Sequence, residues 1–328
     1  MEKLQQIHQS IITSKELLRT HFNVKKNFEL AQSNIKKEVD NILEMQHKEI
    51  PVIPEIDYKS IVNGNVSFDE IINIKRRGAL IIRNVFDDQQ ANEWNDEVGE
   101  YILSNDYFTK SVKREGMDQY FSQLKSGAPQ IFGIYWSRPQ MLARQSQSMS
   151  TTKKFLNSMW NVNSPYGDEF DPNNDFIYAD RIRRREPGDE TLGLSPHIDG
   201  GSFERWTDPA FQKVYGSVFN GDLKSYDPWN AAHRTQTKEY KSPAVCSMFR
   251  TFQGWTALTA QGPSDGTLSL IPIANSMGYL LLRALQDDIA PDSLCDATPG
   301  RPLLISPDYH KDLLDGIVTI QDVNPGDT

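Results

Sequence analysis

The second half of the sequence is a succession of short apolar segments separated by turns rich in glycine and proline. One such segment, residues 267–273, reads Thr-Leu-Ser-Leu-Ile-Pro-Ile and directly follows the turn Gln-Gly-Pro-Ser-Asp-Gly at residues 261–266. Short aliphatic and β-branched runs bounded by such turns are typical of antiparallel sheets, which close into barrels or jelly rolls. The pattern therefore predicts a β-rich core in this half of the chain.

The N-terminal part has a different pattern. Residues 1–48 contain no proline or glycine and are rich in Lys, Gln, Glu and Asn. Their apolar residues recur at helical spacing, which indicates an amphipathic helix; the clearest positions are Phe28, Ala31, Ile35, Val39 and Ile42. We expect residues 1–50 to form a helical extension packed on the body, and residues 51–328 to form a single domain. Such an apolar stripe is also compatible with a homodimer.

Two helix starts are readable in the first third of the chain. Ser67-Phe68-Asp69-Glu70 has the form of a capping box, so we expect a short helix that begins there and ends at Gly78. An apolar strand over residues 79–85 and a second capping signature at Asp87 follow. Helix, strand and helix in this order predict a mixed α+β domain.

A long segment, residues 203–243, is polar and shows no clear period, although it carries Trp206, Tyr215, Tyr226 and Trp229. Loops of this length inside a compact domain are usually lids or binding loops. We therefore expect an irregular loop over a binding site.

Charge and cysteine content exclude several classes of protein. The net charge is −9, and Lys and Arg are spread along the chain, which argues against nucleic-acid binding. No apolar run is long enough to span a membrane, and the N-terminus MEKLQQIHQS lacks the core of a secretion signal. We expect a cytoplasmic protein without membrane partners. Cys246 and Cys295 stand far apart, so neither a zinc ribbon nor a disulfide framework is predicted.

The most informative polar motif is Ser-Pro-His-Ile-Asp-Gly-Gly-Ser at residues 195–202. Side chains two apart on a strand project from the same face, so we expect His197 and Asp199 to point together. One imidazole and one carboxylate are two of the three ligands in the two-histidine, one-carboxylate site that holds ferrous iron. A His-x-Asp motif also occurs as an ordinary surface pair, so its context decides between the two interpretations.

Later motifs provide that context, because they follow in a characteristic order. A turn and strand at residues 265–272 come next, and Pro-Gly-Asp stands at residues 325–327. Together with the His-x-Asp motif they resemble the double-stranded β-helix of iron(II)- and 2-oxoglutarate-dependent oxygenases. More closely, residues 195–202 followed by Glu204-Arg205-Trp206 resemble the signature of a bacterial and fungal family known as domain of unknown function 1479. This resemblance implies an α+β protein with a double-stranded β-helix (jelly-roll, cupin-like) core and an N-terminal helical extension.

The same resemblance implies a function. It suggests a non-haem iron(II), 2-oxoglutarate-dependent dioxygenase that hydroxylates a small molecule, with His197 and Asp199 as metal ligands, Fe(II) as cofactor and 2-oxoglutarate as co-substrate. The retained Asp199 argues against halogenation, because halide-transferring relatives have a small residue there. In that superfamily a distal histidine and a basic residue for 2-oxoglutarate follow the Pro-Gly-Asp turn. The sequence ends at Thr328, so we expect the full protein to continue into that strand.

Several residues have two interpretations each. His310 is the best third ligand within the sequence, but it precedes the Pro-Gly-Asp turn and also fits a structural role. Arg205 and Trp206 either line the substrate pocket or stack on each other to brace the loop. Arg250 either anchors 2-oxoglutarate, since an inward arginine needs an anion, or faces solvent.

Tyr178, on the predicted strand before the metal motif, is a second candidate for contact with the co-substrate. The aromatic, arginine-bearing loop suggests a planar or anionic substrate.

Two other functions stay open. The chain fits a non-catalytic binding protein of the same fold with an incomplete metal site. It also fits a cupin-type metal enzyme that uses no 2-oxo acid, although cupins commonly place several histidines close together and this motif has one. Iron-dependent formation of succinate from 2-oxoglutarate would distinguish the 2-oxoglutarate-dependent oxygenase from both of these functions.

Overall fold

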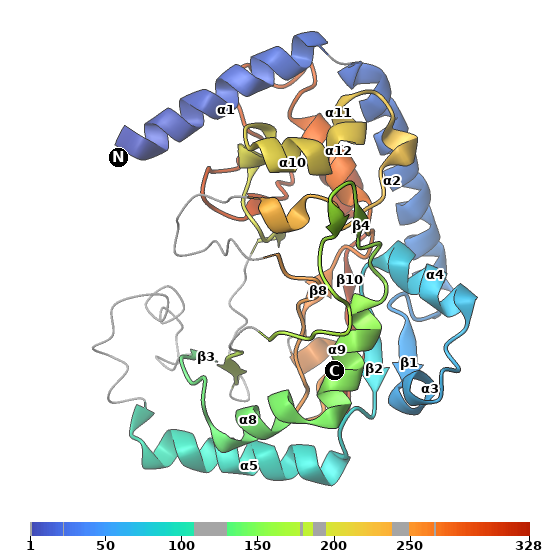
Figure 1. Cartoon of the computed structure of the whole chain (residues 1–328), viewed down its shortest axis with the longest axis vertical. Helices are drawn as coiled ribbons and strands as arrows, with labels where there is room; N and C mark the ends of the chain where they lie inside the picture. The colour runs from blue at the N-terminus through green and yellow to red at the C-terminus, as the bar shows by residue number, and fades with distance from the viewer. Residues whose placement is uncertain are drawn as a thin grey trace.

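The structure is a computed structural model that describes residues 2–21, 23–107, 130–177, 180–185, 195–237, 249–265 and 267–328. Two long helices, α1 (Glu2–His21) and α2 (Val24–His47), form its upper and right-hand edges (Figure 1). Their apolar side chains include Ile11, Ile35 and Ile42. These lie in the largest hydrophobic core of the described residues, together with side chains of the C-terminal half. The helical extension is therefore part of the body of the same chain.

A buried lysine fixes the first of these helices. Lys15 is fully buried, and its Nζ donates hydrogen bonds to the carbonyl oxygens of Ala290 and Ser293, at 2.7 and 2.6 Å. Arg19, one helical turn later, donates to the carbonyl oxygens of Leu285 and Ile289. These contacts join α1 to a segment some 270 residues away in the sequence.

The first third contains β1 (Glu55–Asp57), α3 (Tyr58–Val62), α4 (Phe68–Arg77), β2 (Ile81–Arg83) and α5 (Asp88–Ser104), with β1 and β2 paired in parallel. The predicted capping box is confirmed: Ser67 Oγ accepts from the Glu70 amide, and Glu70 accepts from the Ser67 amide. Gly78 ends α4 at φ +69°, a left-handed conformation that favours glycine. Asp87 caps α5 through the amide of Gln89, without the second half of a box.

The middle of the chain contains β3 (Ile131–Phe132), α8 (Arg138–Gln145), α9 (Gln147–Asn157), β4 (Asn163–Ser164), β5 (Gly167–Asp168) and β6 (Ile182–Arg183). Ser137 and Gln140 form a second capping box, with a proline in the first turn of α8.

The C-terminal half contains β7 (His197–Ile198), β8 (Ser269–Leu270), β9 (Leu303–Leu304) and β10 (Val318–Thr319), with α12 (Ser276–Arg283) and α13 (Lys311–Leu314) between them. The described strands form five separate two-stranded sheets, including β7 with β9 and β8 with β10. The fold is therefore mixed α+β, and the described residues do not form the extended sheets of a jelly roll. The predicted strand 267–273 shows one reason: Pro272 offers no amide to a ladder, and the Ile273 amide turns back to Ile271.

The expectation of an irregular loop over residues 203–243 was wrong for its described part, residues 203–237. This part forms a chain of short helices, namely η1 (Phe203–Trp206), α10 (Pro209–Val214), α11 (Gly216–Phe219), η2 (Leu223–Ser225) and η3 (Arg234–Gln236). Its aromatic residues lie in the core: Trp206 is fully buried and Tyr215 is 3% exposed. Helices of three to six residues are too short to show a hydrophobic period in the sequence.

The Pro-Gly-Asp turn is held between β2 and residues 256–258. The Gly326 amide donates to the carbonyl of Ala257, and the Gly326 carbonyl accepts from the Phe86 amide. Asp327, 2% exposed, accepts from Arg83 Nη1 at 2.6 Å and from the Asn84 amide at 2.9 Å. The last residues are thus an integral part of the fold.

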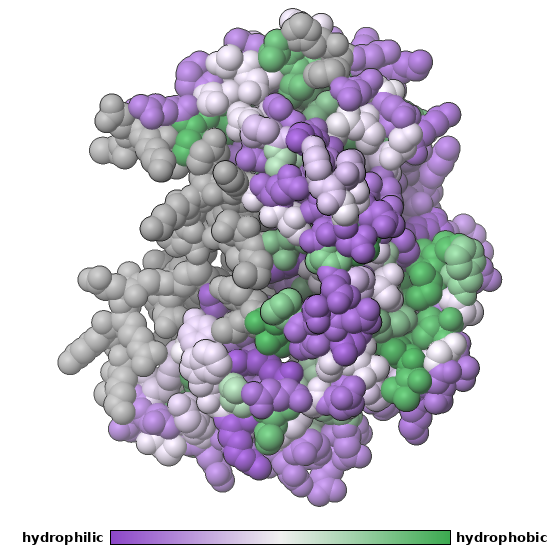
Figure 2. All heavy atoms as spheres, viewed as in Figure 1, coloured by the Kyte–Doolittle hydropathy of each residue, from purple (hydrophilic) through white to green (hydrophobic). Residues whose placement is uncertain are grey.

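Figure 2 shows an apolar patch at the right-hand edge of the molecule, where Figure 1 places α3 and α4. Exposed apolar side chains of these helices include Val62, Phe68 and Ile72. Among the helices that the structure describes, none is long and apolar enough to cross a membrane.

Candidate functional site: a histidine–aspartate pair

The structure brings His197 and Asp199 together, as their spacing on a strand predicts. His197 Nε2 lies 3.4 Å from Asp199 Oδ1, and the two side chains are 32% and 39% exposed. His197 lies in β7, opposite Leu304 of β9, and Asp199 follows the strand directly. The two potential metal ligands are therefore close together, and their side chains are partly exposed to solvent.

Hydrogen bonds orient each member of the pair. His197 Nδ1 lies 2.7 Å from the carbonyl oxygen of Ser195. Because a carbonyl only accepts, Nδ1 carries the proton in the neutral ring, and Nε2 is then free to bind a metal ion; in the protonated ring Nε2 also carries a proton and donates it to Asp199. Asp199 Oδ2 accepts from Gln253 Nε2 at 3.1 Å. Gln253 was not predicted; it stands 54 residues away in the sequence, and no local signal marks it.

The pair shifts the pKa of both groups. The hydrogen bond to Asp199 raises the pKa of His197 despite the opposing effect of burial. The hydrogen bond to His197 lowers the pKa of Asp199, with further lowering from Gln253 and from the charge of Arg250. Asp199 is therefore a carboxylate at neutral pH, and Arg250 lies close enough to act on it.

The donor set fits a divalent metal ion. An imidazole nitrogen, which binds metal once it has lost its proton, and a carboxylate oxygen face each other. The groups behind them, the Ser195 carbonyl and Gln253, have the orienting role that outer-shell partners have in metal sites. Within the described ranges, no group of three His, Cys, Asp or Glu side chains could hold a metal. The described residues thus offer two ligands.

His310 is not brought to this pair. It is 1% exposed, and its Nδ1 accepts a hydrogen bond from the Ser306 amide at 3.0 Å. Burial, and after it the charge of Arg283, lowers the pKa of His310 to about 4. These contacts are those of a structural histidine.

Arg205 holds the backbone of the turn that follows Asp199. It is 3% exposed and donates to the carbonyl oxygens of Asp199, Gly201 and Ser202. Its guanidinium carbon lies 5.4 Å from the ring centre of Phe211. These are bracing contacts, although the stacking partner is Phe211 and not Trp206 as the bracing interpretation assumed.

Trp206 itself is fully buried and packs against Phe203, with 4.3 Å between ring centres. A substrate contact by Arg205 or Trp206 stays a prediction. Tyr178, the second candidate for co-substrate contact, lies outside the described residues, as does Cys246; Cys295 is buried and free.

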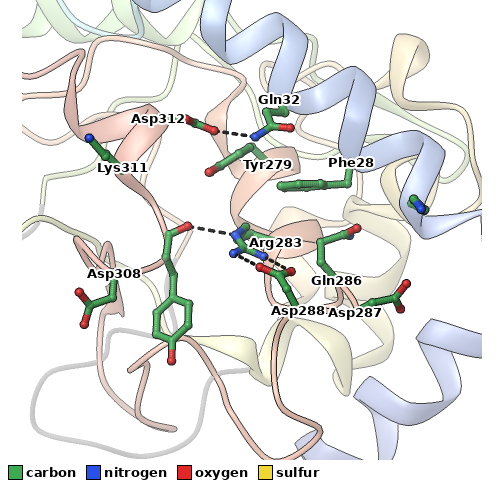
Figure 3. Close-up of a pocket in the computed structure, with 12 residues that line it drawn as sticks. Phe28, Gln32, Tyr279, Arg283, Gln286, Asp287, Asp288, Asp308, Lys311 and Asp312 are labelled. Carbon is green, nitrogen blue, oxygen red and sulfur yellow. Dashed lines mark hydrogen bonds and ion pairs between the residues drawn. The ribbon is translucent and has the colours of Figure 1, made fainter.

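A separate pocket of about 390 Å³ lies between α2, α12 and α13 (Figure 3). Phe28 and Tyr279 stack in its wall with ring centres 5.4 Å apart, and Arg283 forms a two-pronged ion pair with Asp288. None of the residues predicted to bind metal, co-substrate or substrate lines this pocket.

Comparison with known proteins finds similar chains in Escherichia coli and Salmonella typhimurium. The chain is 41% identical over 308 residues to the uncharacterised protein YbiU of Escherichia coli K12, covering 93% of this chain and 73% of that protein. The crystal structure of a candidate oxidoreductase from Salmonella typhimurium LT2 is 40% identical, with a TM-score of 0.90 over 98% of this chain and 77% of the other.

A fungal structure extends the comparison. GlcNAc inducible gene 2 of Candida albicans, a protein of domain of unknown function 1479, has a TM-score of 0.75 at 27% identity, over 97% of this chain and 69% of that one. The resemblance to this family that the motif suggested is therefore confirmed. The family model described as Gig2-like matches residues 5–328. The chain belongs to the Gig2-like family.

Proposed function

We propose that this protein is a non-haem iron(II), 2-oxoglutarate-dependent oxygenase that hydroxylates a small molecule. The observation that carries the proposal is the convergence of His197 Nε2 and Asp199 Oδ1 at 3.4 Å on a part-exposed surface. A third ligand from outside the described residues is part of the proposal, as is a double-stranded β-helix arrangement around the pair. The Salmonella relative, described as a candidate oxidoreductase, supports a redox reaction.

The roles of the residues follow from their contacts. His197 and Asp199 would hold ferrous iron, and the Ser195 carbonyl and Gln253 would keep the two ligands in place. Bound iron would supply oxygen activation coupled to oxidative decarboxylation of 2-oxoglutarate.

Arg250 is the proposed partner of a 2-oxoglutarate carboxylate. It is half-buried, and its positive charge already acts on Asp199. A guanidinium binds a planar carboxylate through two parallel hydrogen bonds. Arg250→Lys would therefore raise the KM for 2-oxoglutarate more than it lowers metal affinity.

The test is an anaerobic Fe(II) titration of the purified protein, followed by measurement of succinate formed from 2-oxoglutarate in air. His197→Ala and Asp199→Ala are expected to weaken Fe(II) binding by more than about 100-fold, because changes behind the ligands alone cost about 10–100-fold. The matched control is His233→Asn. His233 is a loop histidine with φ +68°, a conformation that asparagine tolerates, and its amide is bonded to Glu169.

Three outcomes separate the candidate functions. Tight Fe(II) binding and succinate formation that both depend on His197 support the oxygenase. Fe(II) binding through His197 without succinate formation favours a metal enzyme of another kind. Equal affinity in the wild type, His197→Ala and His233→Asn overturns the metal site and favours a binding protein.

A further inference from the structure

A buried carboxylate, Glu204, follows the turn after Asp199. Neither the His-x-Asp motif nor the proposed chemistry gives it a role. Glu204, on η1, is 3% exposed. A buried carboxylate is costly unless it is paired or fully hydrogen-bonded, and the Glu204 carboxylate is held by hydrogen bonds. Its two oxygens accept from two backbone amides: Oε2 from Ser202 at 2.6 Å, and Oε1 from Gly300.

These two amides belong to segments that lie on either side of the metal pair. Ser202 is three residues after Asp199 in the chain. Gly300 precedes β9, the strand that pairs with β7 and places Leu304 opposite His197. The Ile305 amide adds a further bond to the carbonyl of Pro196. Glu204 therefore connects the turn that carries Asp199 to the strand that supports His197.

The turn needs such a connection because its glycines leave the backbone free to adopt many conformations. Gly200 and Gly201 adopt φ +91° and +87°, and glycine visits these and many other conformations at little cost. Arg205 fixes the carbonyl side of this turn, through Asp199, Gly201 and Ser202. Glu204 fixes its amide side.

We infer that Glu204 is a positioning residue, which holds the Asp199 turn against the His197 strand by accepting the amides of Ser202 and Gly300. The consequence for metal affinity rests on the proposed function, whereas the holding of the turn does not. Glu204 touches neither ligand side chain in the described contacts and acts through the backbone.

Glu204→Gln tests this role with almost no change in shape. A carboxylate accepts one amide on each oxygen, but glutamine has one accepting oxygen and one donating nitrogen. One of the two backbone amides would then face a donor and lose its partner. In the metal-free protein we expect amide hydrogen exchange about 10–100-fold faster in peptides covering residues 197–206 or 296–304.

Glu169→Gln is the matched control. Glu169 also accepts a backbone amide, that of His233 at 2.8 Å, and the hydroxyl of Thr235, in a different loop. This variant is expected to leave exchange in the two peptides unchanged. Unfolding temperatures of both variants are measured alongside, and exchange is compared below the onset of unfolding.

Fe(II) affinity is the second measurement. We expect Glu204→Gln to weaken Fe(II) binding about 10–100-fold, as for other groups behind metal ligands, and Glu169→Gln to leave it unchanged. Unchanged exchange in Glu204→Gln, or equal changes in both variants, overturns the positioning role. If exchange accelerates only in Glu204→Gln while the wild type binds no Fe(II) through His197, the holding role stands and the proposed oxygenase falls.

Discussion

The buried histidine, His310, predicts a specific dependence of stability on pH. In an unfolded chain the pKa of a histidine is near its ordinary value of 6.5, whereas burial and the charge of Arg283 lower the pKa of folded His310 to about 4. Between these values the unfolded chain binds a proton that the folded protein does not. Stability from this group is therefore complete above pH 6.5 and is lost as the pH falls towards 4.

The magnitude follows from the size of the pKa shift. A difference of one pKa unit corresponds to about 1.4 kcal/mol, so a shift from 6.5 to about 4 amounts to about 3 kcal/mol. That is a large part of the 5–15 kcal/mol, roughly, that stabilises a typical domain. Acid should therefore weaken the fold around His310 well before most carboxylates are protonated.

The assay is urea unfolding at several pH values between 7 and 4 for the wild type and His310→Asn. Asparagine keeps an oxygen acceptor for the Ser306 amide, which His310 Nδ1 now accepts, and it does not titrate. The wild type should lose about 3 kcal/mol more than the variant over this range. In His47→Asn, at an exposed position on α2, the free energy of unfolding should change with pH as it does in the wild type. Parallel curves for the wild type and His310→Asn would refute the argument.

Two further predictions concern the backbone. Ser67→Ala removes the capping box of α4 and should cost about 1 kcal/mol of unfolding free energy by chemical denaturation; no change would mean that α4 contributes little to stability. Gly326→Ala places a Cβ in a clash with the carbonyl oxygen of Phe86 at a φ of +90°, so it should destabilise by more than about 2 kcal/mol. Gly64→Ala, with a φ of +66° but open space around it, is the control, and equal losses in the two variants would show that the close approach to Phe86 has no effect.

Local signals predicted local structure well. Both ends of α4 could be predicted because the Ser67–Glu70 capping box and the left-handed Gly78 depend only on residues of the same helix. The meeting of His197 and Asp199 was readable because it follows from the geometry of a single strand. Both predictions needed no knowledge of what the segments pack against.

Contacts between distant segments could not be predicted from the sequence. Gln253 reaches Asp199 from 54 residues away, and Glu204 reaches Gly300 from 96 residues away. Nothing in the local sequence of either pair encodes that proximity. The extended strands expected in the C-terminal half are two residues long where the structure describes them, because turns and prolines such as Pro272 interrupt their ladders.

The central claim is that His197 and Asp199 hold iron, and it is tested most directly by anomalous X-ray scattering from crystals soaked anaerobically with Fe(II). Data collected on both sides of the iron absorption edge locate iron independently of any assumption about the site. The account predicts one strong peak within bonding distance of His197 Nε2 and Asp199 Oδ1, absent in His197→Ala. A peak elsewhere, or no peak near the pair in the wild type, would contradict it.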